Sequence, residues 1–127
     1  MAISDGTSLS GLERGARGAL GGQPIAHDGA CARLEDGTLA GSVLTLDAAF
    51  RQLTGPMGFG LVEAAHLCST TPARALGLTG QGAIVEGGKA DLVVLDRDRR
   101  VVQTYVDGRL VFARHVSEGN SAPPRPV

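Results

Sequence analysis

The sequence predicts an α/β chain that forms the end of a larger fold. Three observations predict this class. Three apolar or small residues at the start of the chain run into Asp5-Gly6 and are typical of the end of a short buried strand, but no partner strand lies near it in the sequence. Apolar residues at helical spacing follow between residues 43 and 69. Beyond Gly77 the pattern changes from helical to strand-like, with several runs rich in β-branched residues.

Composition narrows the class of protein and its partners. A chain of 127 residues with 43% hydrophobic residues is large enough for one core and too small for two. The formal net charge of −1 and the 3% aromatic content argue against a nucleic acid or an anionic membrane as partner. No apolar run approaches the ~18 residues of a membrane span, and no signal peptide is expected. Cys31 and Cys68 are lone thiols, which favours a reducing, cytoplasmic setting.

The first 34 residues combine a strand end, a loop and a hairpin. The first strand ends at Asp5, which places a carboxylate at its tip. Residues 7–22 are rich in glycine and serine and show no period, so we expect a long loop there. Residues 23–34 predict two short strands that meet at the turn Asp28-Gly29.

The segment from residue 36 to residue 42 is the most informative stretch, and it predicts a loop that runs into a helix. Asp36-Gly37 is a turn pair, and Gly41 lets the backbone approach another group closely. Ser42 is the expected N-cap of a helix over residues 43–54. Free N–H groups at a helix start suit an anionic or oxygen-rich ligand. The plainer alternative is a capped helix with no ligand.

Three helices are expected in the middle of the chain. The first ends near Gly55-Pro56, a glycine–proline stop. The second covers residues 61–70 with an apolar stripe. A short third helix begins at Thr71-Pro72 and ends at Gly77.

The last part of the chain predicts strands and then a tail. The β-rich runs are residues 83–85, 91–96, 101–106 and 110–112. Asp107-Gly108 between the last two runs predicts a tight hairpin. Residues 117–127 are polar and proline-rich, which predicts a disordered tail.

Four segments in this order resemble the C-terminal third of the N-acetylglucosamine-6-phosphate deacetylases, which belong to the amidohydrolase superfamily. They are Asp5 after an apolar strand, the stretch Leu39-Ala40-Gly41-Ser42, residues 69–78 and residues 82–93. The last two segments are shared by many amidohydrolases, including dihydroorotases and adenine deaminases. The stretch ending at Ser42 is far more specific to the deacetylases. The resemblance covers residues 2–114.

The resemblance implies a fold and a site. Residues 1–80 would be the C-terminal piece of a TIM-like barrel, with its last strand ending at Asp5, and residues 81–116 would be strands of a small β-sandwich. Catalytic residues of such barrels lie at the C-terminal ends of strands. The resemblance implies that Asp5 is the general base and acid of the hydrolysis. It also implies that Leu39, Ala40 and Gly41 contact the bound sugar phosphate.

The resemblance implies a divalent metal, zinc or similar, in the complete enzyme. Its ligands in that family are a glutamate and two histidines on earlier barrel strands, which this sequence does not contain. His27, His66 and His115 are far apart, and their spacing is not that of a metal cluster. We therefore expect structural or surface histidines, with no metal bound by this chain alone.

Two classes of function follow. The first is an enzyme of amino-sugar catabolism that releases acetate from the small molecule N-acetylglucosamine 6-phosphate. The complete enzyme would be a homodimer. This chain would be its C-terminal part and would be inactive by itself. The second is a non-catalytic remnant or a module that lacks the metal site. Another amidohydrolase, similar to dihydroorotase, is a further alternative, against which the stretch Leu39-Ala40-Gly41-Ser42 argues.

Overall fold

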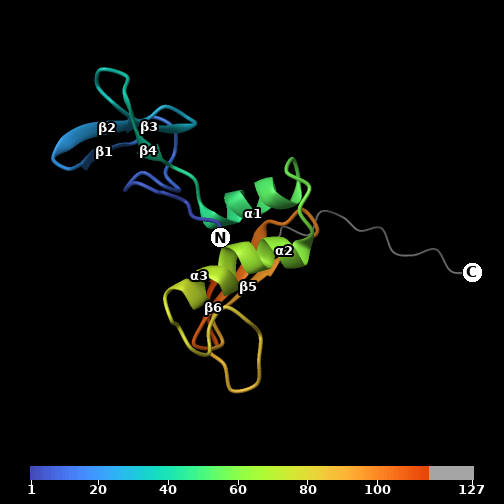
Figure 1. The fold of residues 1–127 in the computed structure, drawn as a ribbon. Coiled ribbons are helices and arrows are strands. Elements are labelled where there is room, and N and C mark those ends of the chain that lie inside the picture. Colours follow the sequence, from blue (N-terminus) through green and yellow to red (C-terminus); the bar gives the residue numbers. More distant parts are fainter. Residues whose placement is uncertain (115–127) are drawn as a thin grey trace, which may run out of the picture. The chain divides into compact units, whose positions relative to one another are not determined.

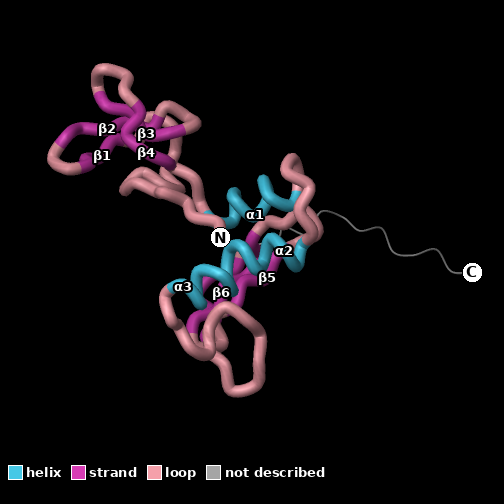
Figure 2. Tube along the Cα trace, in the orientation of Figure 1, coloured by secondary structure: helices cyan, strands magenta, loops and turns pink. Residues whose placement is uncertain are grey.

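The computed structural model describes residues 1–114. They form a four-stranded sheet, a helical part and a three-stranded sheet, in that order along the chain (Figures 1 and 2). The first unit, Met1–Gly88, contains the first sheet and the helices, and a second unit begins at Lys89. The elements are β1 (Arg17–Leu20), β2 (Gln23–His27), β3 (Cys31–Leu34), β4 (Leu39–Ser42), α1 (Leu46–Thr54), α2 (Leu61–Ala65), the π-helical turn η1 (His66–Thr70), α3 (Thr71–Ala75), β5 (Leu92–Leu95), β6 (Val101–Val106) and β7 (Arg109–Ala113).

The first sheet is an antiparallel meander with the strand order β1-β2-β3-β4. The predicted hairpin at Asp28-Gly29 is confirmed, since β2 pairs with β3 across it. The prediction that residues 7–22 are all loop is wrong, because β1 lies inside that range. Gly21 and Gly22 have φ angles of 57° and 81°, and such a pair makes the tight turn that lets β1 pair with β2.

Residues 39–42, the stretch that distinguishes the deacetylases from other amidohydrolases, form a strand and not the predicted loop. It forms β4, which pairs with β3. The first helix begins at Leu46, directly after Thr45, so the prediction that Ser42 is its N-cap is wrong. The Ser42 hydroxyl instead accepts a hydrogen bond from the N–H of Leu44 at 2.9 Å. The predicted end of this helix is confirmed, because α1 stops immediately before Gly55.

The N-terminal strand expected at residues 1–5 is absent from the described part of the chain. Only one parallel bridge forms there, between Gly6 and Ser42. Asp5 has a φ angle of 48°, outside the extended region, so the backbone turns directly beside this bridge. The segment is therefore fixed at single points and not along its length.

The helical part confirms the predicted helices and adds an irregularity. Residues 61–75 are continuously helical, and the π-helical turn η1 joins α2 to α3. Gly77 has a φ of 66°, and the N–H of Leu78 donates to the carbonyl of Ala73 at 2.9 Å. This left-handed cap ends the last helix at the predicted glycine. No helix among residues 1–114 is long and apolar enough to cross a membrane.

The second sheet has the strand order β5-β6-β7 and is also antiparallel. The predicted hairpin at Asp107-Gly108 is confirmed, and both residues have positive φ angles, 48° and 75°. The strand predicted at residues 83–85 is wrong: the carbonyl of Val85 accepts from the N–H of Gly88 in a turn. The tail predicted at residues 117–127 lies outside the described residues, as does His115.

The described chain is thus a mixture of helices and antiparallel sheets, which agrees with the α/β prediction in its coarse form. Within residues 1–114 no barrel is present, because a parallel barrel needs eight paired strands and this range holds one parallel bridge. Leu9, Ile25 and Ala32 are buried and form the core of the first sheet. That core supports the strand on which the candidate site lies.

Candidate functional site

Asp5 and β4, which the sequence analysis predicted as parts of one site, lie next to each other. The N–H of Ser42 donates to the carbonyl oxygen of Asp5 at 3.2 Å. The N–H of Thr7 donates to the carbonyl oxygen of Ser42 at 2.9 Å. These bonds hold the Asp5 segment against the C-terminal end of β4. The side chain of Asp5 is exposed, so its carboxylate is accessible.

The three predicted sugar-phosphate residues have different surroundings on β4. Leu39 is 62% exposed, whereas Ala40 packs against the core. The pairing shifts here: Arg33 lies opposite Leu39 and Ala32 lies opposite Gly41, which leaves Ala40 as the extra residue of a β-bulge. Bulges turn a strand locally and are frequent beside binding sites. The side chain of Leu39 and the backbone of the bulge are therefore the parts of this stretch suited to meet a ligand.

Gly41 is required where it stands because a neighbouring side chain comes close. A Cβ atom at this position would lie 2.7 Å from Cγ2 of Thr7, closer than real Cβ contacts. The same Cβ would lie 3.9 Å from the carbonyl oxygen of Asp5. The glycine thus permits the close approach of the Asp5 segment to β4.

Thr7 joins these parts, and the sequence analysis did not single it out. Its hydroxyl donates to the carbonyl oxygen of Ser42 at 3.1 Å, over a separation of 35 positions in the chain. The same hydroxyl oxygen accepts from the N–H of Leu9 at 3.3 Å. The only sequence feature that indicates a role for Thr7 is its position directly after Asp5-Gly6, because hydroxyls next to such turns often form hydrogen bonds with nearby backbone groups. That signal does not identify the distant partner.

The β2–β3 hairpin beside the site is stabilised by Asp28. Its carboxylate accepts from the N–H of Ala30 at 2.7 Å and from the N–H of Cys31 at 2.8 Å. Nε of Arg33 lies 2.6 Å from the same carboxylate. The N–H of Cys31, then that of Ala30 and the Arg33 guanidinium hold the pKa of Asp28 well below its usual range. The second guanidinium contact, Nη1 of Arg33 to the carbonyl of Gly37 at 2.9 Å, links this hairpin to the turn before β4.

The described residues do not fit a metal ion. Within residues 1–114 no three His, Cys, Asp or Glu side chains are grouped to hold one. His27 is buried, and its Nδ1 atom accepts a hydrogen bond from the N–H of Gly29 at 2.8 Å. One of the two ring nitrogens that could bind a metal is therefore already engaged. His66 lies exposed at the start of η1. Catalytic zinc needs about three converging protein ligands, and neither histidine has such neighbours.

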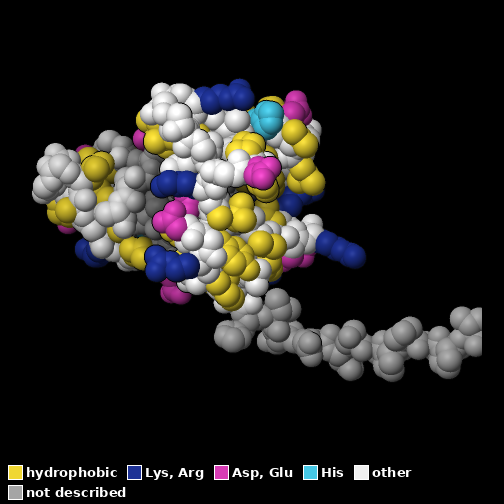
Figure 3. Space-filling view, turned by 90° about the horizontal axis from the view of Figure 1, so that it is seen from below, with side chains coloured by type: hydrophobic (Ala, Val, Ile, Leu, Met, Phe, Trp, Pro, Cys, Tyr) yellow, Lys and Arg dark blue, Asp and Glu magenta, His cyan; other side chains and the backbone are white. Residues whose placement is uncertain are grey.

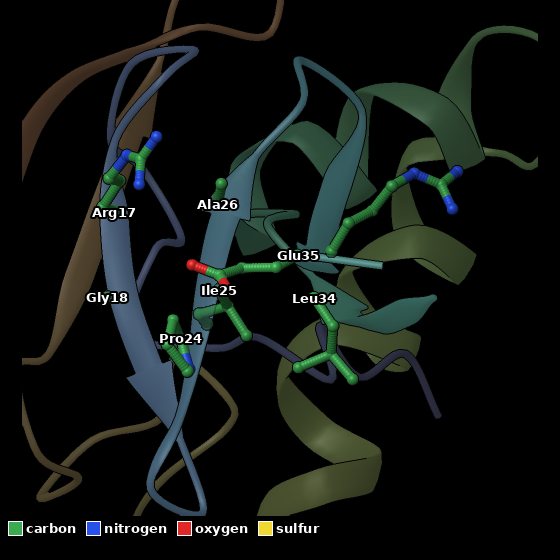
Figure 4. Close-up of a pocket in the computed structure, with 8 residues that line it drawn as sticks. Arg17, Gly18, Pro24, Ile25, Ala26, Leu34 and Glu35 are labelled. Atoms are coloured by element: carbon green, nitrogen blue, oxygen red, sulfur yellow. The ribbon is translucent and has the colours of Figure 1, made fainter. Parts of the chain in front are cut away.

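A shallow pocket of about 320 Å³ lies on β1–β3, and its lining includes none of the predicted site residues. Figure 4 shows Arg17 at one side and Glu35 reaching across the strands above Ile25. Arg33 also lines the pocket, but its guanidinium is bonded to Asp28. Charges of both signs and an apolar floor give this pocket no clear preference for one class of ligand.

Comparison with known proteins assigns the family. A model of the amidohydrolase family matches residues 22–112, and the chain belongs to that family. It is 37% identical over 109 residues to a putative N-acetylgalactosamine-6-phosphate deacetylase of Escherichia coli (strain K12), covering 85% of this chain and 65% of the relative. It is 35% identical over 108 residues to the N-acetylglucosamine-6-phosphate deacetylase of Lysinibacillus sphaericus, covering 85% of this chain and 28% of the relative.

A solved structure gives the same result. The N-acetylglucosamine-6-phosphate deacetylase from Thermotoga maritima superimposes with a TM-score of 0.78 and 38% identity, over 88% of this chain and 31% of that one. The resemblance derived from the four sequence segments is thereby confirmed. The chain spans 65% of the first relative and less than a third of the other two.

Proposed function

We propose that this chain is the C-terminal part of an amidohydrolase that removes the acetyl group from an N-acetylated amino-sugar 6-phosphate. The observation that carries the proposal is the junction of Asp5 with β4, where the N–H of Ser42 donates to the Asp5 carbonyl. A carboxylate and a ligand-contacting strand end are the two parts that the deacetylase resemblance requires of this region. As part of the proposal, residues 1–80 complete a barrel and residues 81–116 contribute to a small sandwich.

Asp5 has the proton-transfer role in this proposal. Hydrolysis of the acetamide consumes one water, breaks the C–N bond, and gives the amine and acetic acid, which are present near neutral pH as the ammonium and acetate ions. The Asp5 carboxylate takes a proton from the attacking water and delivers it to the departing nitrogen, so no net proton stays on the enzyme. Its exposed position at the end of its segment agrees with access to a substrate. The described residues supply no metal site, and the proposed divalent metal, zinc or similar, belongs to the part of the relatives that this chain does not span.

Two sugars are candidates for the substrate. N-acetylglucosamine 6-phosphate follows from the segments that define the resemblance, and relatives such as that of Lysinibacillus sphaericus bear that name. N-acetylgalactosamine 6-phosphate is the second candidate, because the Escherichia coli relative at 37% identity is named for it. The two sugars are epimers, so they differ in the direction of one hydroxyl group.

The proposed partners are limited to this small molecule and, in the complete enzyme, a second copy of the chain. The cytoplasm is the proposed location. Cys31 and Cys68 are both unpaired, as a reducing compartment would keep them.

The test is acetate release by a complete deacetylase that carries this sequence as its C-terminal part. We expect turnover of one of the two epimers, and loss of about 10²–10⁴-fold in kcat in Asp5→Asn with metal content unchanged. An amide keeps the shape of the side chain but cannot accept the proton. Asp98→Asn, in the loop between β5 and β6, is the matched control and should keep full activity.

The 127-residue chain alone provides the second arm of this test. After dialysis against a weak chelator it should hold no stoichiometric zinc and release no acetate. Zinc at one equivalent with turnover would show that the site lies elsewhere in these residues. A complete protein that is inactive on both sugars would favour the non-catalytic remnant or another amidohydrolase activity.

A further inference from the structure

The carbonyl oxygen of Leu67 has no donor at the two positions that normally supply one within a helix. In a π-helical turn, the carbonyl of one residue accepts from the N–H five positions later. For Leu67 that residue is Pro72, which has no N–H. The α-helical donor four positions later is Thr71, and its N–H donates to the carbonyl of His66. The π-turn and the proline together therefore leave the Leu67 carbonyl open to an outside partner.

The outside partner is the segment that carries Asp5. The N–H of Ala2 donates to the carbonyl oxygen of Leu67 at 2.8 Å. Beyond Asp5, the N–H of Ser42 donates to the Asp5 carbonyl at 3.2 Å. The backbone around Asp5 is thus held by η1 on one side and by β4 on the other, both within the unit Met1–Gly88. Because no regular strand pairing fixes residues 1–5, these two points carry most of the constraint on the segment.

We propose that Pro72 is a positioning residue for Asp5. The missing N–H of its ring keeps the Leu67 carbonyl free for Ala2, and that bond fixes the direction in which the segment reaches Asp5. An alanine at this position would place an N–H inside the helix, where it competes for the same carbonyl. The inference rests on the proposed role of Asp5 in proton transfer.

Displacement of a proton-transfer group has a recognisable kinetic effect. A shift of about 1 Å in a reacting group can lower the rate by up to ~10²-fold, because the aligned geometry is lost. Pro72 and Leu67 are outside the predicted sugar-phosphate stretch on β4, so substrate binding does not depend on them directly. The predicted signature is therefore a fall in kcat with little change in KM.

The first experiment compares two proline variants of the complete deacetylase that carries this sequence. Pro72→Ala is expected to lower kcat about tenfold and to change KM less than about twofold. Pro56→Ala, in the turn after α1, also adds an N–H and is the matched control, which should keep the parent kcat. Circular dichroism and thermal unfolding of both variants establish that they are folded. An unchanged kcat in folded Pro72→Ala would overturn the inference.

The second experiment removes the same bond from its other end. Ala2→Pro deletes the N–H donor of this bond and should reproduce the loss in kcat. This variant therefore tests the inference even if Pro72→Ala does not fold. If both changes act through one bond, the double variant should lose no more than either single variant, whereas independent structural damage would multiply the losses. Full activity of Ala2→Pro, or multiplied losses, would overturn the inference. A parent protein that deacetylates neither sugar would instead refute the proposed function, and the inference with it.

Discussion

The backbone N–H of Ser42 lies 3.2 Å from the carbonyl oxygen of Asp5, and this bond joins the two parts of the candidate site. Asp5 precedes the first sheet in the chain and Ser42 ends its last strand, so strands β1 to β3 lie between the two segments. Thr7 strengthens the junction, because its N–H and its hydroxyl both donate to the carbonyl of Ser42. Changes at this junction should therefore alter stability and the candidate site together.

Gly41→Ala should lower the free energy of unfolding by about 1–3 kcal/mol, since the new Cβ would lie 2.7 Å from Cγ2 of Thr7. Thr7→Ser removes that methyl group and keeps the hydroxyl. In the Thr7→Ser background, the cost of Gly41→Ala should fall by at least ~0.5 kcal/mol. Urea unfolding of the four proteins measures this coupling. Equal costs in both backgrounds would show that the methyl contact is unimportant.

Gly108→Val should lower the free energy of unfolding by at least ~1 kcal/mol, because a β-branched residue fits poorly at a φ of 75°. Lack of space is not the cause, since a Cβ here would lie 3.7 Å from that of Ala90, an ordinary contact. Gly108→Asn is the control, because asparagine tolerates this left-handed conformation. An unchanged melting temperature in the valine variant would argue against the hairpin.

Asp28 should make the stability of the first sheet dependent on pH. Its folded pKa lies below the unfolded value, mainly through the N–H groups of Cys31 and Ala30. The stabilisation is therefore complete above the unfolded pKa, near 4, and is lost as the pH falls below it towards the folded pKa. Asp28→Asn should be less stable than the parent at pH 7, and the difference should shrink by pH 3. A difference of constant size would contradict this prediction.

The isolated chain should self-associate. Large apolar side chains are exposed, among them Ile84 at 90%, Leu76 at 74% and Val62 at 70%. Figure 3 shows apolar side chains at the surface between charged ones on the face that it displays. Exposed apolar surface of this extent promotes association. Light scattering should show species larger than a monomer, together with binding of an apolar dye; a compact monomer that binds no dye would be the contrary result.

The predicted hairpins and helix ends are confirmed, because a single turn or a single helix end fixes each of them. The hairpins at Asp28-Gly29 and Asp107-Gly108 follow from the φ preferences of glycine and aspartate. The helix stops at Gly55 and Gly77 follow in the same way. The wrong predictions concern residues whose structure depends on pairing with segments far away in the sequence. The stretch at residues 39–42 contains glycine and serine, which are typical of loops, yet it pairs with β3 as a strand.

The sequence by itself determined the family, the turns and the residue types of the candidate site, because these depend on local order along the chain. Only the tertiary structure decided that Asp5 and Ser42 meet, and that Thr7 and Gly41 make room for each other. The bond between Asp5 and Ser42 is a backbone hydrogen bond, which nearly every residue type can make, so no side-chain pattern in the sequence encodes it. The contact between Thr7 and Gly41 depends on which distant segments the fold brings together, and neither residue type indicates its partner.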